Sequence, residues 1–255
     1  MAWQLHENFH ELCARVFLVV GPASNWIIVR DGDSTLLIDG GYPDDAGRVE
    51  DSLLLAGAAS RPDAVLLTHA HVDHLGAALL LAPQGVPIWC AHDEIGNATG
   101  EAPEQIAPAN ALSLASADPL WEQWANHAMS AGGMTTERLR CDQLRTFSPG
   151  ATLDLPGTPR TLSSASHTSG HVSFECGDVL VTGDALITGH PTSTTHGPQL
   201  LHRLFHHQPA QVADVAAQLI ARTSARSIAP GHGEPATVAD VRAALPLSDG
   251  PRDLD

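Results

Sequence analysis

Three histidines and one aspartate lie within six residues of the stretch 68–76; they are His69, His71, Asp73 and His74. The stretch follows the apolar run 64–67, which predicts a buried strand that ends in a loop crowded with ligand-type side chains. Imidazole and carboxylate together suit zinc, iron or manganese. Four such groups on one loop can serve two neighbouring metal ions, because successive side chains point toward different centres. The alternative, a solvated histidine-rich loop, fits poorly with a position directly after a buried strand.

Three later segments each place a candidate ligand at the end of an expected strand. His167 lies in Ser-His-Thr-Ser-Gly-His, Asp184 follows Val-Thr-Gly, and His232 lies in Pro-Gly-His-Gly. Each alone is ordinary, since an aspartate at a strand end is often only a cap. Together with the first loop they provide five histidines and two aspartates, each at a strand end. The sequence therefore predicts a metal centre built from all seven.

These motifs, in this order, resemble the metallo-β-lactamase superfamily, and within it binuclear hydrolases such as glyoxalase II and the N-acyl homoserine lactonases. The matching segments span residues 16–233. The resemblance implies that one metal is held by His69, His71 and His167. It implies a second metal held by Asp73, His74 and His232, with Asp184 bridging the two. It also implies that Asp39 orients a ligand imidazole, and that His171 supports the site without being a ligand.

Two divalent metal ions, most naturally zinc with iron or manganese as alternatives, define the chemistry that we expect. A water bridging them has a pKa lowered toward neutrality, so a hydroxide can attack a carbonyl carbon that the metals polarise. Asp73 and Asp184 are the expected catalytic carboxylates, and Asp73 could orient the hydroxide and pass a proton to the leaving group. Since no thiol nucleophile is needed, we expect the four cysteines to be small core residues; they are Cys13, Cys90, Cys141 and Cys176.

Two features of the sequence limit the range of possible substrates. A bridging aspartate argues against β-lactams, and only 255 − 232 = 23 residues follow His232, which leaves no room for the helical domain of glyoxalase II. We therefore expect a hydrolase of a lactone or thioester with an apolar portion. Two alternatives stay open. One is a mononuclear iron sulfur dioxygenase that uses only the first three ligands, and the other is a biosynthetic metalloenzyme that catalyses a non-hydrolytic step.

Composition limits the partners. Lys plus Arg is 13 and Asp plus Glu is 29, for a formal net charge of −16, which disfavours nucleic acid as a partner. No apolar run is long enough for a membrane span, and no N-terminal segment resembles a signal peptide. The cysteines form no C-x-x-C motif, so a cytoplasmic protein with reduced thiols is expected. We expect a small-molecule substrate, no nucleic acid and no membrane, and a homodimer stays open.

The order of elements predicts one α/β domain over residues 1–255. Each half has hairpin strands ending in an aspartate beside glycine (Asp39, Asp184), then a helix, then a strand that runs into a histidine-bearing loop (His69, His232). This weak internal repeat favours a four-layer αββα sandwich of two mixed β-sheets flanked by helices. The predicted strands are 16–20, 25–30, 34–39, 64–68, 86–91, 172–176, 179–182 and 227–229, and the predicted helices include 44–58, 74–81, 209–222 and 236–245.

Two segments are expected to select the substrate. Residues 92–144 are a partly helical insertion, with a helix starting at Asp118-Pro119. Its large apolar side chains either form a lid or pocket wall or pack the insertion onto the domain; they are Trp121, Trp124, Met129 and Met134. In the loop 187–207, His190 and His196 are candidate substrate contacts, whereas three further histidines are expected on a solvated face; they are His202, His206 and His207. Residues 246–255 are expected to be a flexible tail.

Overall fold

The computed structural model describes residues 3–245, so the predicted tail at 246–255 lies outside the described residues. Two mixed sheets pack face to face. The larger has the order β1-β2-β3-β4-β5-β6-β7; the strands are β1 (Phe9–Cys13), β2 (Val16–Val19), β3 (Trp26–Asp31), β4 (Ser34–Ile38), β5 (Ala64–Leu66), β6 (Ile88–Ala91) and β7 (Leu144–Phe147). The smaller has the order β12-β11-β10-β9-β8; the strands are β8 (Arg160–Ser163), β9 (Val172–Cys176), β10 (Val179–Gly183), β11 (Ser227–Pro230) and β12 (Ala236–Thr237). Strands β4 to β7 are parallel, as are β10 and β11, and the remaining pairs are antiparallel.

Alternation along the strands divides the apolar side chains between layers. In β3, Ile27 and Val29 pack between the sheets, whereas Ile28 packs on the outer side of the larger sheet. In β10, Val181 packs between the sheets and Leu180 on the outer side of the smaller sheet. All five are at most 2% exposed. Because successive side chains of a strand point to opposite faces, each sheet has two apolar faces and needs a cover on its outer one.

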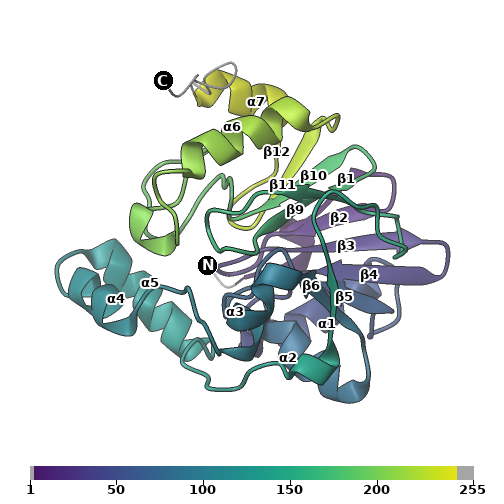
Figure 1. Ribbon diagram of the computed structural model, residues 1–255, viewed down its shortest axis with the longest axis horizontal. Helices are drawn as coiled ribbons and strands as arrows, with labels where there is room; N and C mark the ends of the chain where they lie inside the picture. Colours follow the sequence, from purple (N-terminus) through teal and green to yellow (C-terminus); the bar gives the residue numbers. More distant parts are fainter. Residues whose placement is uncertain (1–2, 246–255) are drawn as a thin grey trace.

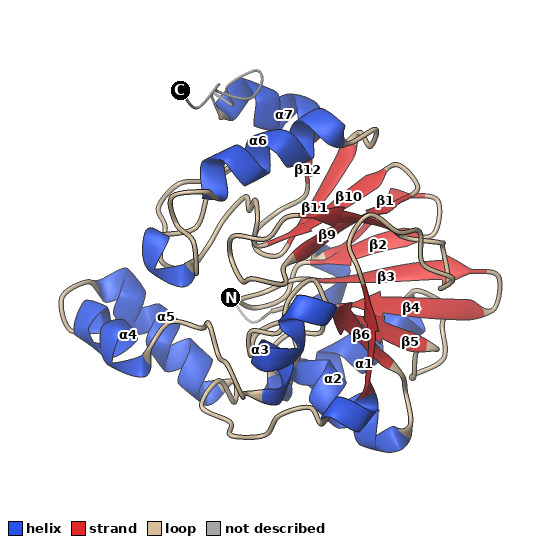
Figure 2. Ribbon diagram, viewed as in Figure 1, coloured by secondary structure: helices blue, strands red, loops and turns tan. Residues whose placement is uncertain are grey.

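Helices supply that cover on both outer faces. Helices α1 (Ala46–Leu55) and α2 (Gly76–Leu81) pack on the larger sheet, and α6 (Val212–Arg222) and α7 (Val238–Ala244) pack on the smaller one (Figure 1). Figure 2 shows the resulting order of layers, with helices above and below the two sheets. The four-layer sandwich predicted from the sequence is therefore confirmed. No helix within residues 3–245 is long and apolar enough to span a bilayer.

The predicted insertion is helical over three short segments, α3 (Ile95–Thr99), α4 (Pro108–Ala115) and α5 (Pro119–Ser130). Helix α5 begins as predicted, because Asp118 Oδ1 accepts a hydrogen bond from the Leu120 amide at 2.8 Å. Its two tryptophans pack on the loop after β10, against Ile187, Leu201 and Phe205.

Two predictions about buried side chains were wrong, one for the methionines of the insertion and one for a cysteine. Met129 and Met134 are 46% and 63% exposed, so neither side chain is buried against the domain. Cys141 is also exposed, since it lies in a 3-10 turn before the edge strand β7. Cys90 and Cys176 are buried in the core as predicted, and Cys13 is half-buried.

Candidate metal centre

The seven predicted ligands all follow strands, and the topology brings those strand ends to one edge. Strands β4 and β5 are parallel neighbours, so Asp39 and the loop that starts at Thr68 leave the larger sheet side by side. Strands β10 and β11 are parallel neighbours in the smaller sheet, so Asp184 and His232 leave it together. The carboxyl ends of parallel strands form a crevice where α/β proteins bind ligands.

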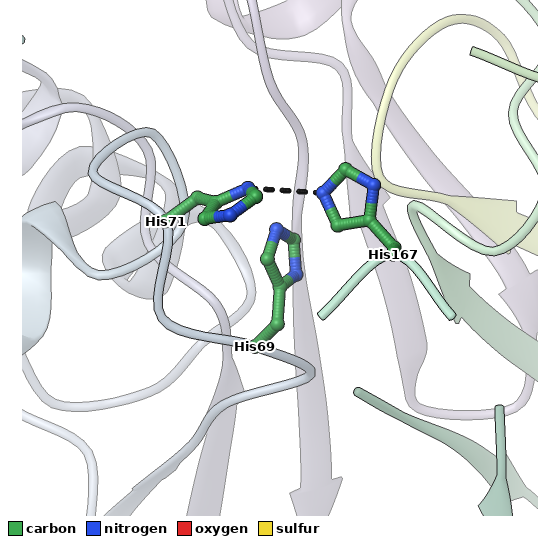
Figure 3. A group of neighbouring side chains, drawn as sticks. All are labelled: His69, His71 and His167. Carbon is green, nitrogen blue, oxygen red and sulfur yellow. Dashed lines mark hydrogen bonds between the residues drawn. The ribbon is translucent and has the colours of Figure 1, made fainter. Parts of the chain in front are cut away.

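Figure 3 shows how the first three imidazoles converge. One ring nitrogen from each of His69, His71 and His167 lies within 4.8 Å of the others, and all three side chains are buried. His71 Nδ1 and His167 Nε2 lie 2.9 Å apart. Two nitrogens bound at about 2.0–2.1 Å to one tetrahedral zinc lie roughly 3.3 Å apart, so this spacing suits ligands of a single ion.

A second group forms beside the first. Ligand atoms of Asp73, His74 and His232 also lie within 4.8 Å of one another. Asp184 contacts both groups, because its carboxylate lies 3.5 Å from His167 Nε2, 3.4 Å from His74 Nε2 and 3.2 Å from His232 Nε2. The structure therefore places all seven predicted ligands together, with Asp184 between two sets of three.

Outer hydrogen bonds orient three of these imidazoles. His69 Nδ1 lies 3.0 Å from Thr68 Oγ1, and His74 Nδ1 lies 3.0 Å from Asp39 Oδ2. His232 Nδ1 lies 2.7 Å from a backbone carbonyl, that of Ala23. When Nδ1 carries the ring hydrogen and donates it to the outer partner, the lone pair is on Nε2. Each outer partner therefore points Nε2 of its histidine toward the shared centre.

Asp39 has the position that the sequence predicted for an orienting residue. Its φ of +60° is unusual for a residue other than glycine. In this conformation Oδ1 accepts from the Thr68 amide at 2.8 Å, and Oδ2 accepts from Thr68 Oγ1 at 2.7 Å as well as from His74. One carboxylate thus joins the end of β4 to the start and the middle of the ligand loop.

His206 was predicted to lie on a solvated face, and that prediction was wrong. The side chain is 9% exposed, and its Nδ1 lies 3.0 Å from Nδ1 of His167. The cause is a backbone pairing: the amide of His207 donates to the His167 carbonyl, which folds the loop back over the ligand. The one sequence signal of this burial was the adjacent apolar pair Leu204-Phe205. Phe205 is buried too, so the apolar pair marks a segment that packs inward.

His171 is placed beside the site but has no nitrogen free for a metal. Its Nε2 accepts from the Asp184 amide at 3.1 Å, so its Nδ1 carries the hydrogen and donates to Ser164 Oγ at 2.8 Å. Burial lowers the pKa of His171 to about 3, so the ring stays neutral. This arrangement fits the supporting role expected for it.

The donor set fits a divalent cation. Within residues 3–245, four buried side-chain atoms of the proposed ligands have no hydrogen-bond partner: His69 Nε2, His71 Nε2, His74 Nε2 and Asp184 Oδ1. Buried polar atoms left unpaired cost about 1–3 kcal/mol each, and charged ones more, so a cluster of them points to a missing ligand. Burial also lowers the pKa of His69 and His167, and that of His71 to about 4, which keeps these rings in the neutral form that binds metals.

Charge at the centre supports the same conclusion. Burial opposes protonation of His74 and His232, yet the Asp184 carboxylate, assisted by Asp73, raises the pKa of both. Burial likewise opposes ionisation of Asp184, but the imidazoles of His232, His74 and His167 hold its pKa well below the usual range. The buried Asp184 carboxylate thus requires positive charge beside it, and a metal would displace the protons that otherwise supply it.

A small cavity of about 20 Å³ opens onto the ligands, enough for a water molecule. Its apolar wall includes Ile106, Trp124 and Phe205. Trp121 does not line it, since this ring stacks on Phe205 with centroids 5.2 Å apart. His190 does line it, with its ring 4.8 Å from that of His232, whereas the exposed His196 lines a separate cavity.

Two residues near the centre were missed by the sequence analysis. Tyr42, the single tyrosine of the chain, is 2% exposed and lines the cavity. Glu94 is fully buried and accepts from the Ala70 amide at 2.8 Å and from Thr168 Oγ1 at 2.7 Å. Glu94 therefore joins the two loops that carry the first three histidines. Its pKa is raised to about 7 by burial.

Comparison with known proteins gives a family and a fold. A sequence profile of the metallo-β-lactamase superfamily matches residues 19–232. A probable metallo-hydrolase of Bacillus subtilis (strain 168), YybB, is 36% identical over 84 residues, which are 32% of this chain and 36% of that relative. The match thus spans about a third of that relative's length.

Solved structures of low identity share the architecture. A metallo-β-lactamase family protein from Thermus thermophilus is 22% identical, with 92% of this chain and 78% of that chain covered and a TM-score of 0.64. An archaeal superfamily protein from Sulfolobus tokodaii is 17% identical, with coverage of 95% and 90% and a TM-score of 0.63. The protein TTHA1623, crystallised in a di-iron-bound form, is 23% identical, with coverage of 89% and 96% and a TM-score of 0.59. At these identities the likeness establishes the fold alone, but the profile match covers most of the sequence, and the chain belongs to the metallo-β-lactamase superfamily.

Proposed function

We propose that this protein is a binuclear metal-dependent hydrolase that cleaves a lactone or thioester with an apolar portion. The observation that carries the proposal is the convergence of two three-residue ligand groups on Asp184, which lies within 3.5 Å of histidines from both. Membership of the superfamily and the partial match to a probable metallo-hydrolase support the same reaction class.

In this proposal His69, His71 and His167 hold one ion, while Asp73, His74 and His232 hold the other. Two ions bound there would supply a water of lowered pKa and polarise a carbonyl oxygen. Asp73 is the most exposed of the seven side chains, at 15%, and its carboxylate lies 3.5 Å from His232 Nε2. It is therefore the residue best placed to orient the water and to pass a proton to the leaving group.

The wall of the cavity supports a substrate with an apolar portion. Ile106 and Trp124 come from the 92–144 segment and Phe205 from the loop after β10, so both segments that are expected to select the substrate reach the centre. With a cavity of about 20 Å³, a substrate enters only when one of these segments moves. We therefore assign a lid role to 92–144 and substrate contact to Trp124 and His190.

The test is turnover by protein of known metal content. We expect two divalent ions per chain, most naturally zinc, and hydrolysis of lactones or thioesters in preference to β-lactams. The finding of a single iron per chain, together with oxygen consumption on a sulfur substrate, would replace the proposal with a mononuclear dioxygenase. The second ligand group, in which His74 and His232 are buried, argues for two ions.

Variants of two proposed ligands, the bridging Asp184 and a ligand of one ion, test the site itself. Asp184→Asn and His167→Ala are expected to lose one or more metal ions. Their kcat/KM should fall by at least the roughly 10–100-fold that the loss of an outer-shell partner costs. His6→Ala, an exposed histidine in the 3-10 turn Leu5–Glu7, is the matched control and should keep both metal and rate. Full metal content and full rate in both site variants would show that the assignment is wrong.

A further inference from the structure

A second and much larger cavity lies beside the metal centre. Its volume is about 770 Å³, within the range of roughly 300–1,000 Å³ usual for small-molecule sites. Four segments form it: the turn 20–23 between β2 and β3, the loop 188–198, residues 233–236, and one face of α7. The proposed reaction uses none of this volume.

The large cavity adjoins the ligand shell. His190 lines both the large cavity and the small one over the metal centre. Ala23 and Gly233 also line the large cavity; the Ala23 carbonyl accepts the hydrogen bond of His232 Nδ1, and Gly233 directly follows His232. A molecule seated in the large cavity would therefore lie one residue away from a proposed metal ligand.

A hydrogen bond fixes the tautomer of His190, which lies where the two cavities meet. Its Nδ1 accepts from the Thr192 amide at 3.2 Å, so in the neutral ring Nε2 carries the hydrogen. No hydrogen bond to Nε2 forms among residues 3–245. His190 thus provides an unpaired N–H donor where the two cavities meet.

The lining of the large cavity is apolar and without positive charge. Prolines, glycines and alanines predominate, and the ionisable side chains apart from histidine are the carboxylates of Glu234 and Asp240. Neither arginine nor lysine lines this cavity or the small one in the described part of the chain, and the full sequence contains no lysine. Proteins that bind phosphate or carboxylate groups use arginine, lysine or helix N-termini. Two carboxylates at the wall instead repel an anionic ligand.

We propose that the large cavity binds the uncharged, apolar arm of the substrate, with His190 donating a hydrogen bond where the arm joins the reacting ester. The inference rests on the proposed function and narrows it. The substrate is a neutral ester-type compound such as an alkyl lactone, and thioesters of anionic carriers are excluded by the charge of the walls.

Binding, measured apart from turnover, is the first test. The probes are uncharged lactams, which are not hydrolysed, with alkyl chains of increasing length, titrated into the metal-loaded protein by calorimetry. While added methylenes enter the cavity, each should tighten Kd by up to about fourfold, the effect of burying one CH₂. In parallel, the hydrolysis of neutral lactones with the same chains is compared with that of a glutathione thioester of matched acyl length.

Two variants fill the cavity from α7, and a third controls for them. Ala243 and Ala244 are exposed and line the cavity, whereas Ala239 is exposed on the same helix but does not line it. Ala243→Phe and Ala244→Phe should each abolish the gain in affinity with chain length. Ala239→Phe should retain that gain. Melting temperatures identify a variant that has not folded. If only one of the two filling variants folds, that variant alone is sufficient for the test.

The outcomes separate the two proposals. If lactams bind with the expected chain-length dependence but no ester is cleaved, the cavity assignment stands and the proposed function fails. If short lactones are cleaved but chain length has no effect on Kd, or all three variants behave alike, the cavity assignment is wrong. Tighter binding or faster cleavage of the glutathione thioester than of the neutral lactone would also overturn it.

Discussion

Hydrogen-bond direction determines which nitrogen of His167 faces the metal centre. His206 Nε2 lies 3.2 Å from the Leu201 carbonyl, which can only accept, so the hydrogen of the neutral His206 ring is on Nε2. Its Nδ1 must then accept, and it does so from His167 Nδ1 at 3.0 Å. His167 is left with a lone pair on Nε2, the atom 2.9 Å from His71 and 3.5 Å from Asp184.

We therefore expect His206→Ala to weaken metal binding by about 10–100-fold, because the outer partner of a ligand histidine is lost. His206→Gln keeps an acceptor oxygen and should restore part of the affinity. The metal affinity of each variant is measured by adding metal to the metal-free protein in competition with a chromophoric chelator. The neighbouring His207 has an exposed side chain, and His207→Ala is the control. Equal affinities for His206→Ala and His207→Ala would contradict this role.

At the residue scale, sequence reasoning succeeded where the side chain itself identifies its chemistry. The seven ligand candidates were predicted because histidine and aspartate, gathered in such number at strand ends, are the side chains that bind divalent metals. His206 and Glu94 were missed for the opposite reason. Their roles depend on a loop folding back and on a buried turn, and in the sequence both look like ordinary surface residues.

At the scale of elements, Glu94 shows how the insertion supports the site. It lies in the 3-10 turn His92–Glu94 directly after β6, where the insertion starts. Its two oxygens accept from the loop after β5 and from the loop after β8, so the first turn of the insertion connects ligand loops that leave different sheets. Glu104, further along the insertion, accepts from the Ser169 amide at 2.7 Å and strengthens the same connection.

Burial raises the pKa of Glu94 from 4.5 to about 7, which gives stability a defined pH dependence. Between these values the folded protein holds more protons on this group than the unfolded chain does, so its contribution to stability falls as pH rises. Glu94→Gln removes this slope, and the free energy of unfolding of the variant relative to wild type should rise between pH 4.5 and 7. Urea unfolding of both metal-free proteins across that range measures it. Histidines that titrate in both proteins cancel in the difference, and parallel curves would contradict the prediction.

Central elements were predictable and edge elements were not. The predicted strands that lie inside the two sheets were found to within about two residues, because both faces are buried and give continuous apolar runs. Strands β1, β7 and β12 were missed, and each is at the edge of its sheet; of the fourth edge strand, β8, only the end at Ser163 was expected. Their residues are mostly half-buried or exposed, so they lack a clear apolar pattern. Helix α5 was predicted from its cap, Asp118, and from the two tryptophans on one face.

At the scale of the whole molecule, the centre joins the two sheets. The loop after β5 supplies four ligand candidates from the larger sheet, and the smaller sheet supplies His167, Asp184 and His232. The repeat read from the sequence corresponds to this arrangement, since Asp39 and Asp184 follow strands in different sheets, as do His69 and His232. Because the seven-residue set is complete only when both sheets are packed, it cannot exist in a partly unfolded chain.

Metal binding should therefore stabilise the entire fold. A ligand that binds only the folded state adds RT ln(1 + [L]/Kd), about 2.7 kcal/mol at 100 times Kd. For a chain of this size each kcal/mol raises the melting temperature by roughly 2–4 °C, so saturating metal should raise Tm by roughly 5–10 °C. Calorimetry with and without a chelator measures the shift, and Asp184→Asn should show a smaller one. Since ligands from both sheets hold the ions, the metal-loaded protein should melt in one transition. Two transitions of which only one moves with metal would show that the ions are held by a single sheet.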